Sequence, residues 1–329
     1  MTLPRGPVAV VGLGLIGGSL ARSLVAAGTD VVGWDPDGQT MLAAADAGIR
    51  AVGSIDEVCG AEPWLVVIAV PLRVVDQTAR ALAPVLARGA FVTDVGSVKG
   101  PVRDAMVAAG LEDRFIGAHP MAGTEHSGFQ ASDTQLLRDA RWAVTLDATT
   151  PMEGFLAVVE LVVDVLGGTV HPLSDSVHDE AAALISHVPH VVATELLNIV
   201  AHSTITDVAV GLAAGSFRDG TRVARTDPAR TEAMVVENAG WVGPALRVAA
   251  RDLERLADAL DSNGPTGWFF SRADALRAGG AEPGSQTLST VTLDPQGPWQ
   301  TELVALGARG GRITGTGEGS SVVVEDPGT

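Results

Sequence analysis

Short apolar runs alternate with stretches of helical periodicity along the first half of the chain. Between the runs, apolar residues recur at helical spacing, as in residues 16–27. Continuous apolar runs are typical of strands buried on both faces, and strands alternating with helices predict a doubly wound, Rossmann-type parallel sheet in an α/β fold. The predicted strands are residues 7–11, 30–34, 64–70, 91–94, a stretch ending at Gly117, and 142–146.

The pattern changes after about residue 150. Residues 153–166 predict one helix and 169–173 a short extended piece, and helical spacing then continues for about 100 residues from Ser174. Glycines interrupt it at 215–220 and 240–244, and Ser174 and Asp175 are candidate N-caps of its first helix. This pattern predicts an all-helical domain, whose abundant Ala, Leu and Val favour a homodimer built on it.

The 329 residues suit about two domains. We predict a dinucleotide-binding domain over 1–172 and a helical substrate and dimerisation domain over 173–280. The remaining tail, 281–329, is rich in Gly, Ser, Thr and Pro, with Val-rich patches at 290–293 and 322–324. This composition fits either a small β appendage or partial disorder, and it indicates no role for the tail.

Composition excludes several classes of partner and chemistry. A net charge of −17 is unfavourable for binding nucleic acid, and Cys59 is the only cysteine, so no internal disulfide can form. No signal peptide fits before the first strand, and no apolar run reaches the roughly 20 residues of a membrane span, which predicts a cytoplasmic protein. There is no Tyr, and Lys99 is the only Lys beside 21 Arg, so few residues other than His or carboxylates can act as acid or base.

A dinucleotide fingerprint follows the first predicted strand. Gly12, Gly14 and Gly17 have the G-x-G-x-x-G spacing and open a predicted helix, and Asp35 ends the second strand. Backbone N–H groups at the helix N-terminus would bind the pyrophosphate. The Asp35 carboxylate would accept hydrogen bonds from the ribose hydroxyls and repel a 2′-phosphate, which favours NAD over NADP. Ile16 and Pro71 complete the expected cofactor-binding set.

The segment around His119 carries the candidate chemistry. We expect His119 in a loop at the carboxyl end of a strand, the edge where doubly wound sheets hold ligands. Ser97 lies in a second loop after a strand, and Thr124 and Glu125 follow His119 closely. A histidine with a pKa near neutrality suits removal of a hydroxyl proton while hydride leaves the same carbon, which indicates oxidation of an alcohol.

Two further motifs lie in the predicted helical domain. His187 and His190 have a spacing compatible with a metal, but no third ligand is obvious, and a helix kinked at Pro189 is the simpler interpretation. We therefore predict no metal and a substrate-facing role for His190. Arg222 lies in a predicted glycine-flanked loop, where a guanidinium can bind a carboxylate.

These segments together resemble the prephenate and arogenate dehydrogenase family of tyrosine biosynthesis, in family order over about residues 7–275. The matching segments are Gly12–Ala21, Asp94–Gly100, Gly117–Glu125, His178–Asp179, Ser186–His190 and Phe217–Val223. The resemblance implies NAD-dependent oxidative decarboxylation of prephenate to 4-hydroxyphenylpyruvate. It also implies that His119 accepts the proton of the ring hydroxyl, that Ser97 holds that hydroxyl and the imidazole, and that Arg222 binds a substrate carboxylate. Thr124, Glu125 and His190 would line the pocket.

Some features depart from the family pattern or leave alternatives open. Many family members carry a Trp shortly after the Asp-Pro that here is Asp227-Pro228, where this chain has Ala229, Arg230 and Thr231. Arogenate or 4-amino-4-deoxyprephenate are alternative substrates, and the sequence does not indicate tyrosine feedback. The β-hydroxyacid dehydrogenases also join a nucleotide-binding domain to a helical one, but they use a catalytic Lys in the helical domain. This chain has no Lys after Lys99, which disfavours that class. A non-catalytic NAD-binding sensor is a further alternative.

Overall fold

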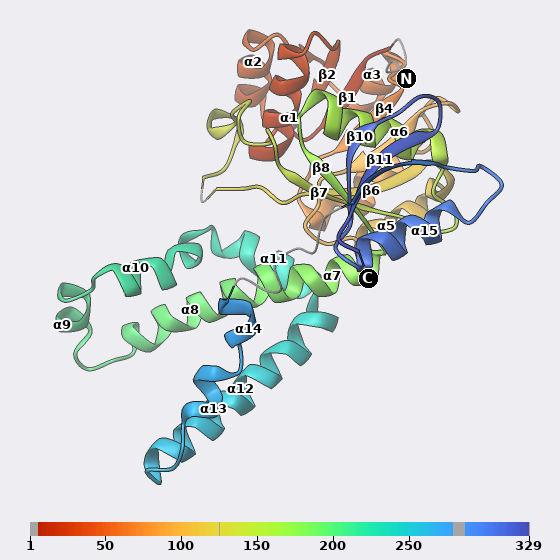
Figure 1. The fold of residues 1–329 in the computed structure, drawn as a ribbon. Coiled ribbons are helices and arrows are strands. Elements are labelled where there is room, and N and C mark those ends of the chain that lie inside the picture. The colour runs from red at the N-terminus through yellow and green to blue at the C-terminus, as the bar shows by residue number, and fades with distance from the viewer. Residues whose placement is uncertain (1–5, 125, 279–286, 329) are drawn as a thin grey trace. The chain divides into compact units, whose positions relative to one another are not determined.

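An eleven-stranded sheet is built from the apolar runs of the first half of the chain and from its C-terminal segment (Figure 1). The computed structural model describes residues 6–124, 126–278 and 287–328. The strand order is β3-β2-β1-β4-β5-β6-β7-β8-β10-β11-β9. The strands are β1 (Val8–Val11), β2 (Val31–Trp34), β3 (Arg50–Ala51), β4 (Leu65–Ile68), β5 (Phe91–Asp94), β6 (Phe115–Pro120), β7 (Arg141–Thr145), β8 (Thr169–Leu173), β9 (Thr287–Thr292), β10 (Arg312–Thr316) and β11 (Ser321–Asp326).

The first six strands in this order are parallel and have the strand order of a Rossmann fold. Helices cover both faces, and two clusters of buried apolar side chains lie between them and the sheet. One cluster lies under α1, α2, α6 and α15, and the other lies under α3, α4 and α5. These helices are α1 (Leu15–Ala26), α2 (Gly38–Asp46), α3 (Ile55–Gly60), α4 (Val75–Leu82), α5 (Gly100–Ala109), α6 (Met152–Glu160) and α15 (Trp299–Ala308). The single helix predicted over 153–166 is α6 continued by a π-helical turn, Leu161–Val165.

The predicted parallel sheet is confirmed from β3 to β6, and its strand direction changes at β7. This strand runs antiparallel to β6 and parallel to β8. Pairing with β7 also extends β6 as far as Pro120, so that His119 lies in a strand rather than in the predicted loop. The apolar run ends at Gly117, and only the partner strand shows that the extended backbone continues.

The C-terminal segment is a β appendage. Strands β9 and β10 lie on either side of β11, all neighbours are antiparallel, and β10 joins the module to β8. Helix α15 packs closely on β8, since a Cβ at Gly307 would lie 1.7 Å from the carbonyl oxygen of Pro172. The Val-rich patches seen in the sequence are parts of β9 and β11, and Val322 and Val324 belong to the core.

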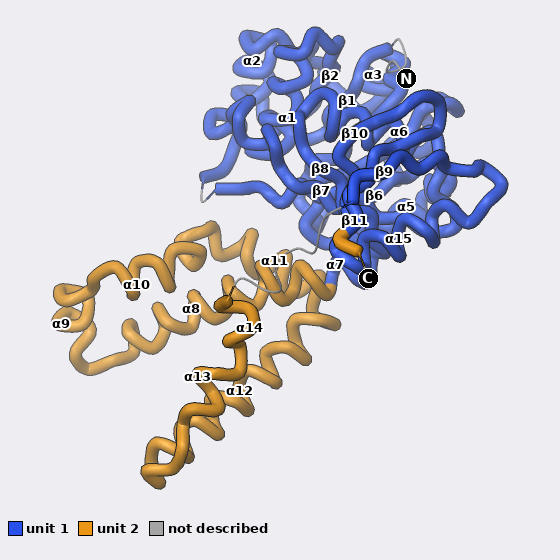
Figure 2. The backbone as a smooth tube through the Cα atoms, in the orientation of Figure 1, with its two compact units in different colours: residues 1–179, 287–326 blue, residues 180–286, 327–329 orange. Residues whose placement is uncertain are grey.

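The chain divides into two units, coloured separately in Figure 2. Unit 1 comprises residues 1–179 and 287–326, and unit 2 comprises residues 180–286 and 327–329. The division therefore falls seven residues after the predicted boundary at 172, because β8 and the start of α7 (Asp175–Ala182) belong with the sheet. Most of the tail that was predicted as a separate segment also belongs to unit 1.

Unit 2 is helical, as predicted, and its helices are interrupted beside the first glycine-rich segment, at 212–214, rather than within it. Residues 215–220 form α10, and Pro244 lies inside the 23-residue helix α12. A π-helical turn, Ala183–His187, precedes Pro189 where a kink was expected. The helices after this turn are α8 (Val188–Ala201), α9 (Thr206–Gly211), α10 (Gly215–Gly220), a 3₁₀ turn (Arg222–Arg225), α11 (Pro228–Glu237), α12 (Ala239–Asp261), α13 (Gly267–Ser271) and α14 (Asp274–Arg277).

One helical stretch, Asp175–Ala201, is long and apolar enough to cross a membrane by length and composition alone. The prediction that no apolar segment is long enough for a membrane span is therefore wrong for this stretch. Its first turns nevertheless carry His178 and Asp179, which are buried in polar contacts within unit 1. Ser174 caps its start, as predicted, by accepting a hydrogen bond from the Val177 N–H group.

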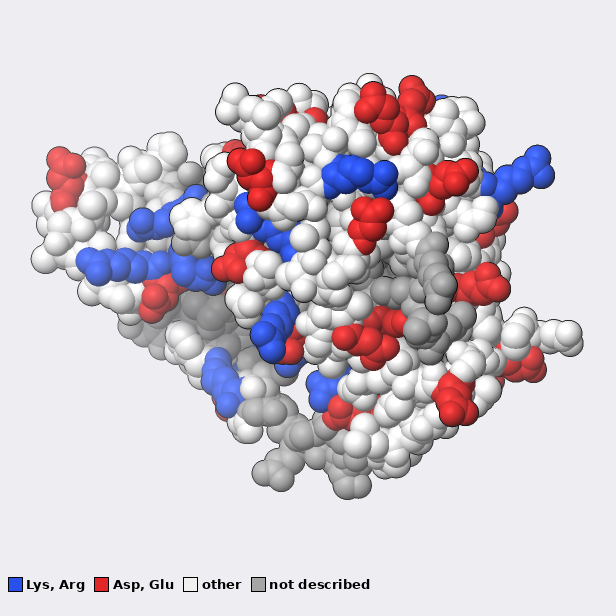
Figure 3. Space-filling model, turned by 90° about the horizontal axis from the view of Figure 1, so that it is seen from above, with Lys and Arg blue, Asp and Glu red and all other residues white. Residues whose placement is uncertain are grey.

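Charged side chains are mixed on the face shown in Figure 3. Basic side chains are scattered among acidic ones there and form no continuous basic patch in the described part of that face. This distribution agrees with the acidic balance of the sequence.

Candidate active site

The three fingerprint glycines have different roles in the turn between β1 and α1. Gly12 has a φ of +95°, and a Cβ there would lie 2.6 Å from the Ala69 carbonyl oxygen. A Cβ at Gly17 would lie 2.0 Å from the Gly12 carbonyl oxygen, so both positions require glycine for close packing. Gly14, at the N-cap of α1, has open space around its missing side chain. A phosphate can therefore approach the helix N-terminus at Gly14.

Asp35 follows β2 and supports this turn directly. Its Oδ2 accepts a hydrogen bond of 2.8 Å from the Leu13 N–H group, and its Oδ1 accepts one of 2.9 Å from the Asp37 N–H group. The carboxylate is half-buried and keeps further lone pairs for ribose hydroxyls. Ile16 is half-buried in the first turn of α1, and Pro71 is exposed after β4. Because no side chain caps α1, its first N–H groups and Asp35 fit a dinucleotide.

A chain of three side chains links β6 to α7. His119 Nδ1 lies 3.0 Å from His178 Nε2, and His178 Nδ1 lies 2.8 Å from Asp179 Oδ1. The two imidazole rings meet edge to face at 75°. His178 and Asp179 are buried, whereas His119 is half-buried. The chain thus runs from a partly accessible imidazole to an enclosed carboxylate.

This chain determines which nitrogen of His119 is basic. A carboxylate only accepts hydrogen bonds, so His178 Nδ1 carries the proton that it shares with Asp179. In the neutral ring, His178 Nε2 then accepts a hydrogen bond from the N–H group at His119 Nδ1. The lone pair of His119 therefore lies on Nε2, an assignment that follows from the hydrogen-bond network.

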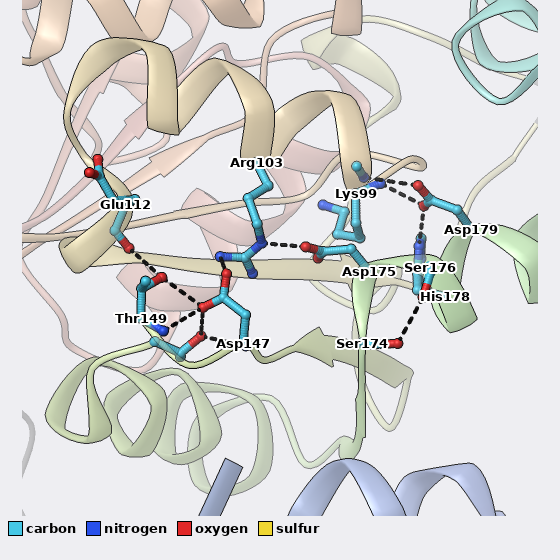
Figure 4. Close-up of polar contacts among 12 residues, drawn as sticks. Lys99, Arg103, Glu112, Asp147, Thr149, Ser174, Asp175, Ser176, His178 and Asp179 are labelled. Atoms are coloured by element: carbon cyan, nitrogen blue, oxygen red, sulfur yellow. Dashed lines mark hydrogen bonds and ion pairs between the residues drawn. The ribbon is translucent and has the colours of Figure 1, made fainter. Parts of the chain in front are cut away.

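Asp179 itself is held by the N-terminus of α5 (Figure 4). Its Oδ1 accepts a 2.7 Å hydrogen bond from the Lys99 N–H group, and its Oδ2 accepts a 2.9 Å hydrogen bond from the Gly100 N–H group. Burial opposes the charge of Asp179, but the hydrogen bonds from His178, Lys99 and Gly100 prevail and lower the pKa of this carboxyl. Asp179 therefore remains ionised and acceptor-only near neutral pH.

A neighbouring cluster anchors the start of α7 (Figure 4). The Arg103 guanidinium on α5 contacts Asp175 of α7 and lies 2.8 Å from the Asp147 carboxylate. The hydroxyl and N–H groups of Thr149 donate to Asp147. These contacts join α5 to α7 and to the segment after β7. Asp175 lies three residues before His178, so the contacts support the helix that carries His178.

The other residues predicted in unit 1 are less constrained. Ser97 is half-buried between the anchored residues Asp94 and Lys99, and the described residues include no hydrogen bond between Ser97 and His119. Thr124 is exposed and accepts a hydrogen bond from the His126 N–H group. Glu125 lies outside the described residues.

The remaining predicted residues belong to unit 2. His190 Nδ1 donates to the Ser186 carbonyl oxygen at 2.8 Å, which leaves Nε2 as its acceptor nitrogen. Arg222 is exposed at the start of its 3₁₀ turn, which replaces the loop predicted there. His187 is buried and lies 3.0 Å from the Asn238 side chain. In the described part of the chain, no three His, Cys, Asp or Glu side chains form a group that could hold a metal ion.

Four residues that were not predicted as site residues contact this region: His178, Asp179, Asp94 and Lys99. His178-Asp179 entered only as a matching segment, because its position 59 residues after His119 gives no sign of contact. One signal was available: the paired His and Asp interrupt the start of an apolar helix, and buried polar residues there need partners. A second signal was Lys99, the single Lys of a chain that otherwise uses Arg.

The chain matches two family models that together cover most of it. Residues 20–171 match the nucleotide-binding domain of prephenate dehydrogenase, and residues 174–268 match its dimerization domain. Helix α15, β9, β10 and β11 lie beyond both matches.

Curated relatives agree with these domains. The chain is 33% identical over 262 residues to cyclohexadienyl dehydrogenase of Zymomonas mobilis, covering 78% of this chain and 88% of the relative. It is also 33% identical over 252 residues to prephenate dehydrogenase of Bacillus subtilis, covering 72% of this chain and 66% of the relative.

Solved structures agree as well. Prephenate dehydrogenase from A. aeolicus, in complex with hydroxyphenyl propionate and NAD⁺, has a TM-score of 0.78 and 29% identity, and the match covers 85% of this chain and 99% of that one. A putative prephenate dehydrogenase from Corynebacterium glutamicum has a TM-score of 0.80 and 32% identity, with 94% and 98% covered. Both the Rossmann sheet and the helical unit are therefore shared with these proteins, and the chain belongs to the prephenate dehydrogenase family of NAD-dependent dehydrogenases.

Proposed function

We propose that this protein catalyses the NAD-dependent oxidative decarboxylation of prephenate to 4-hydroxyphenylpyruvate, with His119 as the base. The observation that carries the proposal is the His119–His178–Asp179 chain at the carboxyl end of β6. Strands β1 and β6 are parallel members of one sheet, so His119 and the glycine turn lie at the same edge. An oriented imidazole at this edge suits proton removal from an alcohol.

NAD, when bound at the glycine turn, would accept the hydride from ring C4 of the substrate. His119 Nε2 would take the proton of the C4 hydroxyl as this carbon becomes a carbonyl. The ring carboxylate then leaves as carbon dioxide, its bonding electrons enter the ring, and the oxygen recovers a proton from His119. The proton balance closes within the site, so His119 ends the reaction in its starting state.

His178 and Asp179 would support both the uptake of the proton by His119 and its later return. His178 accepts from His119 Nδ1–H, and the nearby Asp179 carboxylate stabilises the positive charge that the imidazole acquires. Because the pKa of Asp179 is lowered, this negative charge is present throughout the neutral range. A general base of this kind contributes roughly 10²–10⁴-fold in rate.

Substrate binding would use the less constrained residues. Arg222 is an exposed cation suited to a carboxylate, and Ser97 would hold the ring hydroxyl beside His119. Thr124, Glu125 and His190 would line the pocket. The family's dimerization domain and the apolar surface of unit 2 support a homodimer, and we expect the protein to act on its small-molecule substrate in the cytoplasm.

Arogenate is the alternative substrate, because it differs from prephenate only in carrying an amine where prephenate has a ketone. One of the structural relatives, from Synechocystis, is an arogenate dehydrogenase with a TM-score of 0.70 and 28% identity. The proposed geometry of the base would serve either substrate equally, since the reacting carbon is the same.

Initial rates of NADH or NADPH formation with prephenate and arogenate, each with NAD and NADP, test the proposal. We expect the highest kcat/KM with prephenate and NAD. A higher kcat/KM with arogenate would replace the substrate assignment, and no turnover of either compound by a folded, NAD-binding protein would contradict the proposed function.

A further inference from the structure

Both main-chain polar groups of Ala118, the residue before His119, are bound by one buried ion pair. The Ala118 N–H group donates to Asp94 Oδ1 at 3.0 Å, and its carbonyl oxygen accepts a 2.8 Å hydrogen bond from Lys99 Nζ. Lys99 and Asp94 also contact each other directly. Their side chains are 0% and 1% exposed, respectively. The pair therefore holds the backbone that leads into the candidate base.

The early end of β5 explains why side chains bind here. Strand β5 pairs with β6 at Val92–Phe115 and Thr93–Ile116 and ends at Asp94. Further along β6, Ala118 thus lacks a neighbouring strand on that side. The Asp94 carboxylate and the Lys99 ammonium supply the acceptor and donor that a longer β5 would have offered, and so they satisfy two buried main-chain groups.

Gly117 makes room for this arrangement. A Cβ at this position would lie 2.3 Å from Thr145 Oγ1 and 3.4 Å from Lys99 Cδ. A larger residue would therefore displace β7 or the lysine side chain. The compact ammonium of lysine, with three donors on a flexible stem, suits this narrow space better than the planar guanidinium used elsewhere in the chain.

Lys99 also reaches His119 by a second route. Its main-chain N–H group donates to Asp179 at 2.7 Å, Asp179 orients His178, and His178 contacts His119. The same residue thus holds the backbone before the base through its ammonium and the side chain of the base through its amide. Asp94 adds a hydrogen bond from the Gly96 N–H group, which ties the Ser97 loop to the same pair.

Stability alone does not require that the groups which satisfy Ala118 be charged. Burial lowers the pKa of the Lys99 ammonium, and the Asp94 charge opposes this shift but offsets only part of the desolvation cost. Replacing a buried ion pair by matched neutral groups is often neutral or stabilising. We propose that the Asp94–Lys99 ion pair is a positioning element for catalysis, which holds His119 at the substrate hydroxyl through Ala118. This inference rests on the proposed role of His119.

Three variants test the proposal: Lys99→Met, Asp94→Asn and the double variant. We expect Lys99→Met to lower kcat about 100-fold, as expected when a catalytic group is displaced by about 1 Å, with substrate KM and NAD affinity changed less than about threefold. Lys99→Met alone leaves the Asp94 charge unpaired and is expected to lower the melting temperature. The double variant removes both charges, so we expect it to regain part of that stability, while the Ala118 carbonyl loses its lysine donor and kcat stays low.

Arg312→Met is the matched control. Arg312 forms a bidentate ion pair with Glu325 between β10 and β11, apart from β5 and β6. Its loss is expected to affect the melting temperature but to leave kcat within about twofold. A double variant with wild-type kcat would overturn the proposal, because the ion pair would then be dispensable for turnover.

A spectroscopic measurement separates this inference from the proposed function. In ¹⁵N-histidine NMR spectra, the hydrogen-bonded Nδ1–H proton of His119 is expected to be protected from exchange in the wild-type protein. We expect this protection to fall in Lys99→Met and in the double variant, while the signal of buried His187 is unchanged. Unaltered protection in both variants would contradict the positioning role even if the protein oxidises a substrate other than prephenate.

Discussion

The two units of this chain differ in how they bury their apolar residues. Unit 1 buries the apolar residues of its inner strands in two clusters, and β1 and β4 are fully buried. In unit 2, the buried apolar residues are few and mostly small: Ala182, Ala183, Ala193 and Val242. Its large apolar residues remain exposed, among them Ile185, Ile199, Leu212 and Leu276, which are 60% or more exposed.

The polar groups show the same contrast. In unit 1, His178, Asp179, Asp94 and Lys99 are buried and connected by hydrogen bonds within the unit. In unit 2, Arg222 is exposed at the surface of a short turn. The difference indicates that unit 1 holds the His119–His178–Asp179 contacts by itself, whereas the proposed dimer interface and the proposed carboxylate contact both involve unit 2.

The largest expected effect concerns the exposed face of unit 2. Ile199→Asp places a charge on α8, where the side chain is 60% exposed, and we expect it to weaken subunit association at least about 100-fold because a dimer would bury that charge. Light scattering should then report the 33.6 kDa monomer in place of a dimer. Leu42→Asp on α2, 64% exposed in unit 1, is the control and should remain dimeric. Identical masses for all three proteins would show that this face is not the interface.

Asp179→Asn tests the organisation of the base in unit 1. We expect kcat to fall by about 10- to 1,000-fold, because an amide can donate to His178 and disturb the tautomer of His119. Loss of the negative charge should also shift the acidic limb of kcat/KM to lower pH, since protonated His119 is less stabilised. Asp76→Asn, the same change at an exposed site on α4, is the control. An unchanged pH profile in Asp179→Asn would separate this carboxylate from the base.

The same variant has a predicted effect on stability. Because the folded-state pKa of Asp179 is lowered, its ionisation stabilises the protein above the unfolded-state value of about 3.8. That contribution is lost as the pH falls through the folded-state pKa. Urea unfolding of wild type and Asp179→Asn should therefore differ at neutral pH and converge under acid conditions. A difference that persists unchanged in acid would assign the stability loss to packing instead.

Arg222→Ala tests the exposed cation of unit 2. We expect substrate KM to rise at least about tenfold, since a charged hydrogen bond to a carboxylate contributes about 1.5–3 kcal/mol, while NAD affinity is unchanged. Arg225→Ala, also exposed in the same 3₁₀ turn, is the matched control and should change KM less than about twofold. Equal effects of the two substitutions would place the carboxylate site elsewhere.

The smallest expected effect is at Asp35. Asp35→Ala removes the carboxylate that is expected to repel a 2′-phosphate, so the ratio of kcat/KM for NAD to that for NADP should fall about tenfold. The substitution also removes the acceptor of the Leu13 N–H group, which should weaken binding of both cofactors. Asp30→Ala, at an exposed ion pair before β2, is the control. A constant cofactor ratio would argue against the ribose contact.

Local patterns predicted strands such as β1 and β4 well, because each is a continuous apolar run, but they missed the two-residue strand β3. They failed where long-range pairing decides the structure. The backbone at His119 is extended only because β7 pairs with it, and residues 215–220 are helical despite their glycines. The composition of the tail fitted either a β appendage or partial disorder, because strands β9 and β11 are recognisable only once they pair with each other.

The site shows the same limit. Residue types and spacing identified His119 and the glycine turn, since each stands in a local motif. The contacts of His119 with His178 and of Lys99 with Asp179 span 59 and 80 residues, and no local pattern reports such distances. Buried polar residues in an apolar helix indicate that partners exist, but only the fold identifies them.

The rate of NADH formation by His119→Asn, with NAD binding measured on the same preparation, tests the account most directly. Asparagine retains a hydrogen-bonding group of similar reach but cannot accept the proton. The account predicts unchanged NAD affinity and a loss of roughly 10²–10⁴-fold in kcat. Turnover near the wild-type rate in this variant would show that His119 is not the base.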